Sequence, residues 1–107
     1  MSKGDEPGFG KVPREKAFYF FTSIGNYTGK SASSLSEFVE RISEVDVKSL
    51  EFHLYRKDFE KWFTEVLQDE TLAEEVRKLY TLNLTGEILR SHLYKIVAAR
   101  LKGSRTQ

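Results

Sequence analysis

The sequence contains no cysteine, and it is poor in several other residues that carry specialised chemistry. Its 107 residues include two histidines, one tryptophan and one methionine. Without cysteine, the chain has no disulfide framework, no thiolate metal ligand and no thiol nucleophile. This composition fits a reducing compartment, and we expect a cytoplasmic protein.

Long apolar runs are absent as well. Residues 1–7 lack the apolar core of a signal peptide, and no segment approaches the roughly 20 apolar residues that a membrane-spanning helix needs. We therefore expect no membrane partner. Hydrophobic residues make up 39% of the chain and charged residues 31%, which favours a folded domain over disorder.

The net charge of +1 hides an uneven distribution along the chain. Residues 35–75 hold twelve acidic and five basic side chains, whereas residues 76–107 hold one acidic and seven basic side chains. Such a division can reflect ordinary solvated helix faces, or a basic end that contacts phosphate or another acidic partner. The sequence leaves both interpretations open.

The N-terminal part predicts a flexible segment followed by β-structure. Residues 1–16 are rich in glycine, proline and charge, which is typical of a mobile lead-in. The aromatic run at 17–22 predicts a strand, and a second short strand around 27–28 is expected after a turn at Gly25–Asn26. Because an isolated two-stranded ribbon is marginal in water, it must pack on helices or pair with a second copy.

The remainder predicts helices with recognisable starts. Ser34 and Glu37 form the pattern of a capping box, Asp46 can cap a second helix, and Asp69 or Thr71 can open a later one. Thr85 can cap the last helix. We expect that helix to end at 102, with a glycine in the left-handed position after it.

A helix break is predicted in the aromatic segment 50–63, which holds five of the fourteen aromatic residues. Two apolar stripes in this region would point to nearly opposite sides of one continuous helix. Either that helix is buried on two faces, or the chain breaks near Arg56–Asp58 with Asp58 as the next cap. The break is the simpler solution. The predicted fold is mainly α, with four or five short helices packed with an N-terminal β-strand or hairpin. We expect a single globular helical domain at 17–102 and a flexible basic tail at 103–107.

The sequence contains no complete catalytic or cofactor-binding motif. The segment Gly25–Ser31 resembles a phosphate-binding loop, but its glycines are too closely spaced and Ile24 occupies the position of the first one. His53 and His92 lack partners at metal-binding spacing. A structural histidine at a helix boundary is the favoured interpretation of His53 over an acid–base role. We expect no enzyme activity, no cofactor, no metal and no small-molecule substrate.

Two surfaces are candidates for binding. Alternation along the first strand sends two of its four aromatic residues to each face, so the uncovered face could pair with a second copy in a homodimer. These residues are Phe18, Tyr19, Phe20 and Phe21. The basic C-terminal part could contact phosphates without reading sequence. Its candidate contacts to RNA or another partner are Arg90, Lys95, Arg100, Lys102 and Arg105.

Several segments resemble a family of small archaeal proteins of unknown function. The resemblance spans about residues 17–80, and its best motif is Phe52-His53 followed by Asp58-Phe59-x-x-Trp62. Further matching segments are Ala17–Phe20, Ser34–Phe38 and Val66–Ala73. The family is expected to carry a small turn residue, often glycine, before the aspartate, where this chain has Lys57. The chain is also similar to archaeal ribosome dimerization factors, which are homodimers that join small ribosomal subunits and block their association with the large subunit.

The expected function is that of a non-catalytic homodimeric factor for ribosome hibernation under stress. The resemblance implies that it bridges or sequesters small ribosomal subunits, contacting rRNA and ribosomal protein, and so prevents subunit association. An alternative is a general protein–protein interaction adaptor that docks through an aromatic surface without contacting RNA. A third hypothesis, an enzyme that uses His53 with nearby carboxylates, has the least support.

Overall fold

The computed structural model describes residues 10–105. A short 3-10 helix at Arg14–Lys16 leads into two strands and five helices. These elements are β1 (Phe18–Ser23), β2 (Asn26–Ala32), α1 (Leu35–Ile42), α2 (Val47–Tyr55), α3 (Asp58–Glu65), α4 (Glu70–Thr81) and α5 (Gly86–Arg105). The prediction of a mainly α fold with an N-terminal hairpin is confirmed.

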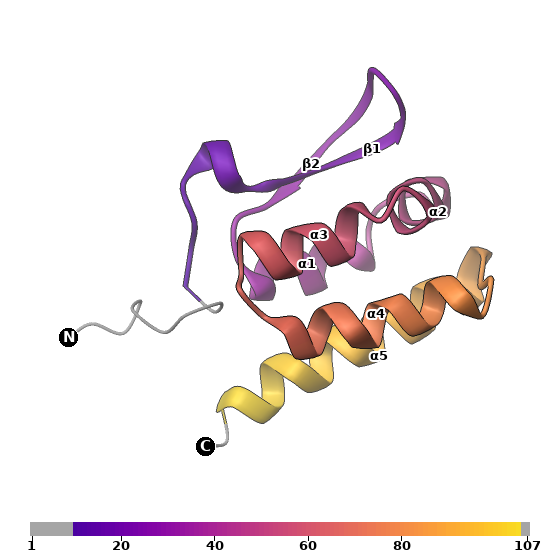
Figure 1. The fold of residues 1–107 in the computed structure, drawn as a ribbon. Coiled ribbons are helices and arrows are strands. Elements are labelled where there is room, and N and C mark those ends of the chain that lie inside the picture. Colours follow the sequence, from indigo (N-terminus) through magenta and orange to yellow (C-terminus); the bar gives the residue numbers. More distant parts are fainter. Residues whose placement is uncertain (1–9, 106–107) are drawn as a thin grey trace.

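The elements form three layers (Figure 1). The β1–β2 hairpin lies over α1, α2 and α3, and α4 and α5 cover the opposite side of these helices. β1 contacts α2, β2 contacts α1, and α5 contacts α1, α2 and α4. The helical layer therefore supplies the packing that a two-stranded ribbon needs.

The hairpin is antiparallel and irregular near its turn. Phe18 pairs with Ala32 and Phe20 with Lys30, but the register shifts beyond Phe20, leaving a bulge in β2. Thr28 fills the bulge, because its hydroxyl donates to the Phe20 carbonyl at 2.7 Å and accepts from the Lys30 N–H at 3.1 Å. A side chain thus replaces a direct bond between the strands.

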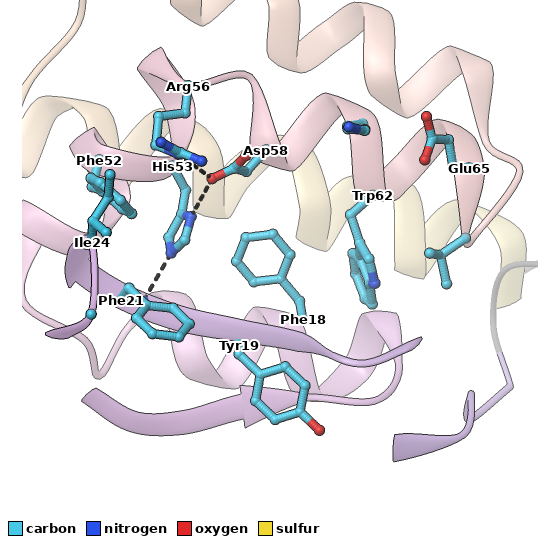
Figure 2. Close-up of a pocket in the computed structure, with 13 residues that line it drawn as sticks. Phe18, Tyr19, Phe21, Ile24, Phe52, His53, Arg56, Asp58, Trp62 and Glu65 are labelled. Atoms are coloured by element: carbon cyan, nitrogen blue, oxygen red, sulfur yellow. Dashed lines mark hydrogen bonds and ion pairs between the residues drawn. The ribbon is translucent and has the colours of Figure 1, made fainter. Parts of the chain in front are cut away.

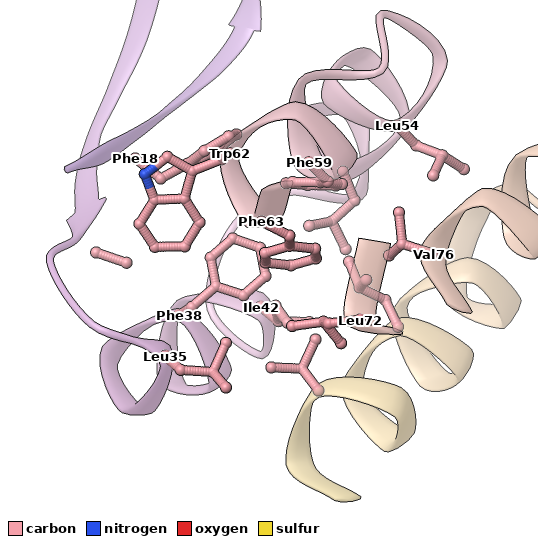
Figure 3. Close-up of a cluster of buried hydrophobic side chains, with 14 of the residues drawn as sticks. Phe18, Leu35, Phe38, Ile42, Leu54, Phe59, Trp62, Phe63, Leu72 and Val76 are labelled. Atoms are coloured by element: carbon pink, nitrogen blue, oxygen red, sulfur yellow. The ribbon is translucent and has the colours of Figure 1, made fainter. Parts of the chain in front are cut away.

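An aromatic core joins the hairpin to the helices (Figure 3). The Phe38 ring stacks on Trp62 at a centroid distance of 5.5 Å and meets Phe18 edge-on at 5.7 Å. Phe20, Phe38 and Phe63 have no exposed surface. Fully burying a side chain of this kind contributes about 1.5–3 kcal/mol, so this cluster is a main source of stability. Aliphatic side chains of α1, α2, α4 and α5 continue the core away from the sheet.

Several predicted helix starts are confirmed with small differences. The Ser34 hydroxyl accepts from the Glu37 N–H at 3.1 Å, but the Glu37 carboxylate reaches back to Ser33, one residue earlier than a standard capping box. Asp46 caps α2 through the Lys48 N–H. Of the two candidates for the start of α4, Asp69 is the cap.

The predicted break between α2 and α3 is confirmed, but Asp58 is not the cap. α3 begins at Asp58, and the residue before it, Lys57, takes the N-cap position with a left-handed φ of 67°. This conformation favours glycine and costs other residues about 1–2 kcal/mol. The small turn residue that the resemblance leads us to expect here therefore has a physical basis.

The two ends of the domain differ from the prediction. α5 continues through Gly103 to Arg105, so the expected helix end at 102 is wrong. Glycine in a last helical turn costs only about 1 kcal/mol, which does not stop the helix. At the other end, the expected flexible segment 1–16 is in part held down, because the Val12 N–H donates to the Ser33 carbonyl at 2.7 Å and Lys11 pairs with Glu37 at 2.8 Å. The rest of that segment, residues 1–9, lies outside the described part, as do residues 106–107 of the predicted tail.

Candidate functional site

An open groove lies between β1 and α3, and we call it the β1–α3 groove (Figure 2). Its volume is about 450 Å³, within the range of roughly 300–1,000 Å³ typical of ligand sites. The lining residues come from β1, the turn after it, α2, the α2–α3 connection, α3 and the residue after it. They are Phe18, Tyr19, Phe21, Ile24, Gly25, Phe52, His53, Arg56, Asp58, Lys61, Trp62, Glu65 and Val66.

The four aromatic residues of β1 divide between core and surface. Phe18 and Phe20 are 6% and 0% exposed and pack inside the protomer, whereas Tyr19 and Phe21 are half-buried. This corrects the expectation that all four form a dimer interface, because strand alternation places Phe18 and Phe20 among the helices. Of these four residues, only Tyr19 and Phe21 are accessible to a second molecule.

His53 of α2 fastens the free edge of β1. Its Nε2 accepts the Phe21 N–H at 2.9 Å, and its Nδ1 lies 2.8 Å from the Asp58 carboxylate (Figure 2). Because Nε2 accepts a hydrogen bond from a backbone N–H, it carries no proton. We therefore assign the neutral ring with its proton on Nδ1, which donates to Asp58. Burial lowers the pKa of His53 below its ordinary value, and the Asp58 carboxylate opposes that shift only in part.

Asp58 gathers two donors at one oxygen. Besides His53, the Arg56 guanidinium donates to the same Oδ2 at 3.1 Å, and this guanidinium also lies 5.1 Å from the centre of the Phe52 ring. The turn at Lys57 brings these side chains together, because it changes the direction of the chain between α2 and α3 within two residues. The motif Phe52-His53 followed by Asp58 thus forms one wall of the groove.

The geometry leaves His53 no free ring nitrogen for proton transfer to a ligand. Both nitrogens are engaged, and the lining residues include no serine, threonine or cysteine that could act as an activated nucleophile. Within residues 10–105, no three metal-ligating side chains lie close enough to hold a metal ion.

Trp62 of α3 fastens the chain just before β1, at the other end of the groove. Its indole N–H donates to the Lys16 carbonyl at 2.8 Å, and its ring packs edge-on against Phe18. Val66 lies beyond it along the chain, and Lys61 and Glu65 form the exposed rim on α3. The sole tryptophan is therefore both a core residue and a wall of the groove.

Two of the predicted basic contacts have structural roles. The Arg90 guanidinium donates to the carbonyls of Ile42 and Val45 at 2.8 and 2.7 Å, and it pairs with Glu87. In this way it ties α5 to the residues at and after the C-terminal end of α1, and Glu87 raises its pKa. Arg90 is thus largely committed within the protomer.

Arg100 is engaged as well. It donates twice to the Asp69 carboxylate, from Nε at 2.7 Å and from Nη2 at 3.1 Å. Asp69 is 7% exposed and also caps α4. Lys95 and Lys102 are exposed on α5, and the side chain of Arg105 lies outside the described part. The predicted basic cluster is therefore reduced to two described lysines.

Sequence reasoning missed the groove itself. Phe52 and Ile24 line it, and Ile24 at the hairpin turn is 81% exposed. A surplus of aromatic residues in the segment 50–63 was the available signal. The segment does not reveal which of these aromatic residues the hairpin covers, because that depends on the long-range contact between β1 and α2.

Comparisons with known proteins identify a family for this chain and nothing more specific. The comparison with curated proteins found no match, and neither did the comparison with solved structures. None of the helices at 10–105 is both long enough and apolar enough to cross a membrane. Residues 13–107 match the family of unknown function DUF5752, and the chain belongs to that family.

Proposed function

We propose that this protein is a non-catalytic interaction module that docks on a protein partner through the β1–α3 groove. The observation that carries this proposal is the open, largely apolar groove beside a strand edge, with both nitrogens of its histidine engaged. An exposed apolar surface of this kind is a common mark of an interaction site.

The exposed apolar residues around the groove support this proposal. Ile24 projects from the hairpin turn, and Phe21 and Phe52 are only half-buried. Leaving such side chains in water forfeits the stabilisation that burying apolar area provides, about 25 cal/mol per Å². A partner that covers them recovers part of that free energy.

Site-specific photo-crosslinking tests the proposal. A photoreactive phenylalanine analogue is placed at Phe52 in the groove and, as the matched control, at Tyr94, which is 43% exposed on α5. We expect a defined protein adduct from position 52 that Ile24→Asp removes and that Ile88→Asp, on the exposed part of α5, leaves intact. Added salt should change its yield little, because apolar contacts are not screened. Equal labelling from positions 52 and 94 would refute the proposal.

A second candidate function is the bridging or sequestering of small ribosomal subunits by a homodimer in the cytoplasm. Lys95 and Lys102 favour it, because they are exposed and lie seven residues apart, hence on one face of α5. The similarity to archaeal ribosome dimerization factors points the same way. Tyr19 and Phe21 remain available for pairing with a second copy.

Sedimentation distinguishes the two candidates. The ribosomal function predicts co-migration with small subunits on a sucrose gradient and a steep loss of binding with added salt. A double variant, Lys95→Glu with Lys102→Glu, should abolish co-migration, whereas Lys48→Glu on α2 should not. Light scattering on the free protein measures its mass and tests the homodimer. A protein that never migrates with small subunits lacks this function.

A further inference from the structure

The main chain of β1 presents an unused hydrogen-bonding pair to the groove. In an antiparallel ladder, main-chain groups alternate between facing the partner strand and facing away from it. Thr28 bridges Phe20 and Lys30, so that pair faces inward. The residues next to this pair direct their main-chain groups outward, away from the partner strand. The Ser31 carbonyl accepts from Arg41 at 2.8 Å, and the Phe21 N–H donates to His53. Tyr19 is the partner of Ser31 and therefore directs its N–H and carbonyl away from β2, toward the groove.

Helix side chains occupy main-chain groups on both sides of Tyr19, one on β1 and one in the 3-10 helix just before it. His53 takes the Phe21 N–H, and the Trp62 indole takes the Lys16 carbonyl. The space between these two fastenings is the β1–α3 groove, and no residue of β2 lines it. A short stretch of open strand edge thus lies along the β1–α3 groove, and residues of α2 and α3 line the groove beside it (Figure 2).

The charges around the groove balance. Arg56 is paired with Asp58, and Lys61 and Glu65 lie one helical turn apart on the rim of α3. Such a lining gives no net attraction to a nucleic acid, which requires a basic surface. It is complementary to an uncharged ligand.

We infer that the groove binds an uncharged, extended peptide segment of a partner protein, which adds as a strand to the free edge of β1. The segment exchanges two main-chain hydrogen bonds with Tyr19. Its alternate side chains, spaced two residues apart, enter the groove as apolar anchors against Phe52 and Trp62. This inference rests on the proposed function, and it specifies how the partner is recognised.

One pair of variants isolates the main-chain contact. Tyr19→Pro and Tyr19→Ala both remove the phenol, but only the proline removes the outward N–H, and it breaks no bond to β2 because that N–H faces away. The probe is a phage-displayed library of random decapeptides selected on the wild-type protein. Selected peptides are kept if they bind Ile88→Asp but not Ile24→Asp.

We expect the retained peptides to carry apolar residues at alternate positions and to bind Tyr19→Pro about fivefold to tenfold more weakly than Tyr19→Ala, the effect of one hydrogen bond. If Tyr19→Pro does not fold, N-methylation at successive amides of the peptide supplies the same test, with one position weakening binding by a similar factor. Saturating peptide should also slow exchange of the Tyr19 amide proton in the wild-type protein.

Three results would overturn the inference: no groove-dependent peptide, anchors at helical spacing, or equal affinity for the two Tyr19 variants together with indifference to N-methylation. The photo-crosslinking at Phe52 is read separately. A crosslinked partner combined with any of these results would keep the interaction module and remove the strand-addition mode. Absence of a position-52 adduct would remove the module itself.

Discussion

Replacement of His53 gives the sharpest test of how the hairpin is attached to the helices. His53 is 4% exposed and makes one hydrogen bond to β1 and one to Asp58. In His53→Ala, the Phe21 N–H loses its partner at a cost of about 1–3 kcal/mol, and the bond to the carboxylate, worth about 1.5–3 kcal/mol when shielded, is lost too. Because Asp58 is partly exposed and keeps Arg56, we expect a total loss of about 3 kcal/mol.

Two other replacements of His53 separate the contributions of its two hydrogen bonds. His53→Gln can place an amide oxygen near the position of Nε2 and keep the Phe21 bond, whereas His53→Asn can place an amide nitrogen near Nδ1 and keep the Asp58 bond. The Asn variant should be the less stable of the two, because the Asp58 carboxylate can recover a partner from water more easily than the Phe21 N–H can. Urea unfolding followed by the fluorescence of Trp62, which is 7% exposed, measures each free energy of unfolding.

The same histidine makes stability depend on pH. Since burial holds the native pKa of His53 below the unfolded value of about 6.5, the unfolded chain takes up a proton first as the pH falls. The contribution of His53 to the free energy of unfolding is therefore complete above about pH 6.5. It decreases as the pH drops through the unfolded pKa and levels off below the native pKa. His53→Gln should remove this part of the slope. A cost below about 1 kcal/mol for His53→Ala, or a wild-type slope that persists in His53→Gln, would refute the reasoning.

Three further substitutions have expected outcomes. Lys57→Gly should be about 1 kcal/mol more stable than Lys57→Ala in thermal unfolding, because both lose the contact of Lys57 with the Tyr80 ring but only glycine relieves the left-handed φ; equal stability would contradict the strain. Ser49→Ala should raise the free energy of unfolding by about 1 kcal/mol, because the Ser49 hydroxyl is buried without a hydrogen-bond partner; a loss on urea denaturation would show that the hydroxyl is satisfied. Asp69→Ala should lower the free energy of unfolding by about 3 kcal/mol, because it loses the cap of α4 and the pair with Arg100. Asp69→Asn should cost clearly less, since the amide keeps the cap. Equal costs in chemical denaturation would mean that the ion pair contributes nothing.

Local signals in the sequence determined most helix starts, and long-range contacts determined the rest. Ser34 with Glu37, and Asp46, act within one helical turn, so their pattern is readable in the chain itself. Asp58 looked like a cap for the same reason, yet its carboxylate turns to His53, a residue of the preceding helix. Gly103 carries a terminator signal that the helix overrides.

The candidate site was predictable only in part, because the burial of an aromatic residue depends on its neighbours in space. Strand alternation correctly separated Phe18 and Phe20 from Tyr19 and Phe21, although it could not say which pair faces the helices. The basic residues show the same limit. Arg90 meets carbonyls 45 and 48 residues earlier in the chain, a contact that charge counting along the sequence cannot reveal.

Tyr19 connects the two binding modes and also allows them to be separated. Its ring lies on the opposite side of β1 from His53 and Trp62 (Figure 2), where it contacts Tyr27 of β2 at a centroid distance of 5.9 Å. Its main chain instead faces the groove, as the pairing of β1 requires. A homodimer that uses the Tyr19 ring should therefore weaken in both Tyr19→Ala and Tyr19→Pro, whereas a peptide in the groove should distinguish the two variants. The outer face of the hairpin and the groove can thus serve different partners at the same time, because side chain and main chain of one strand point in different directions.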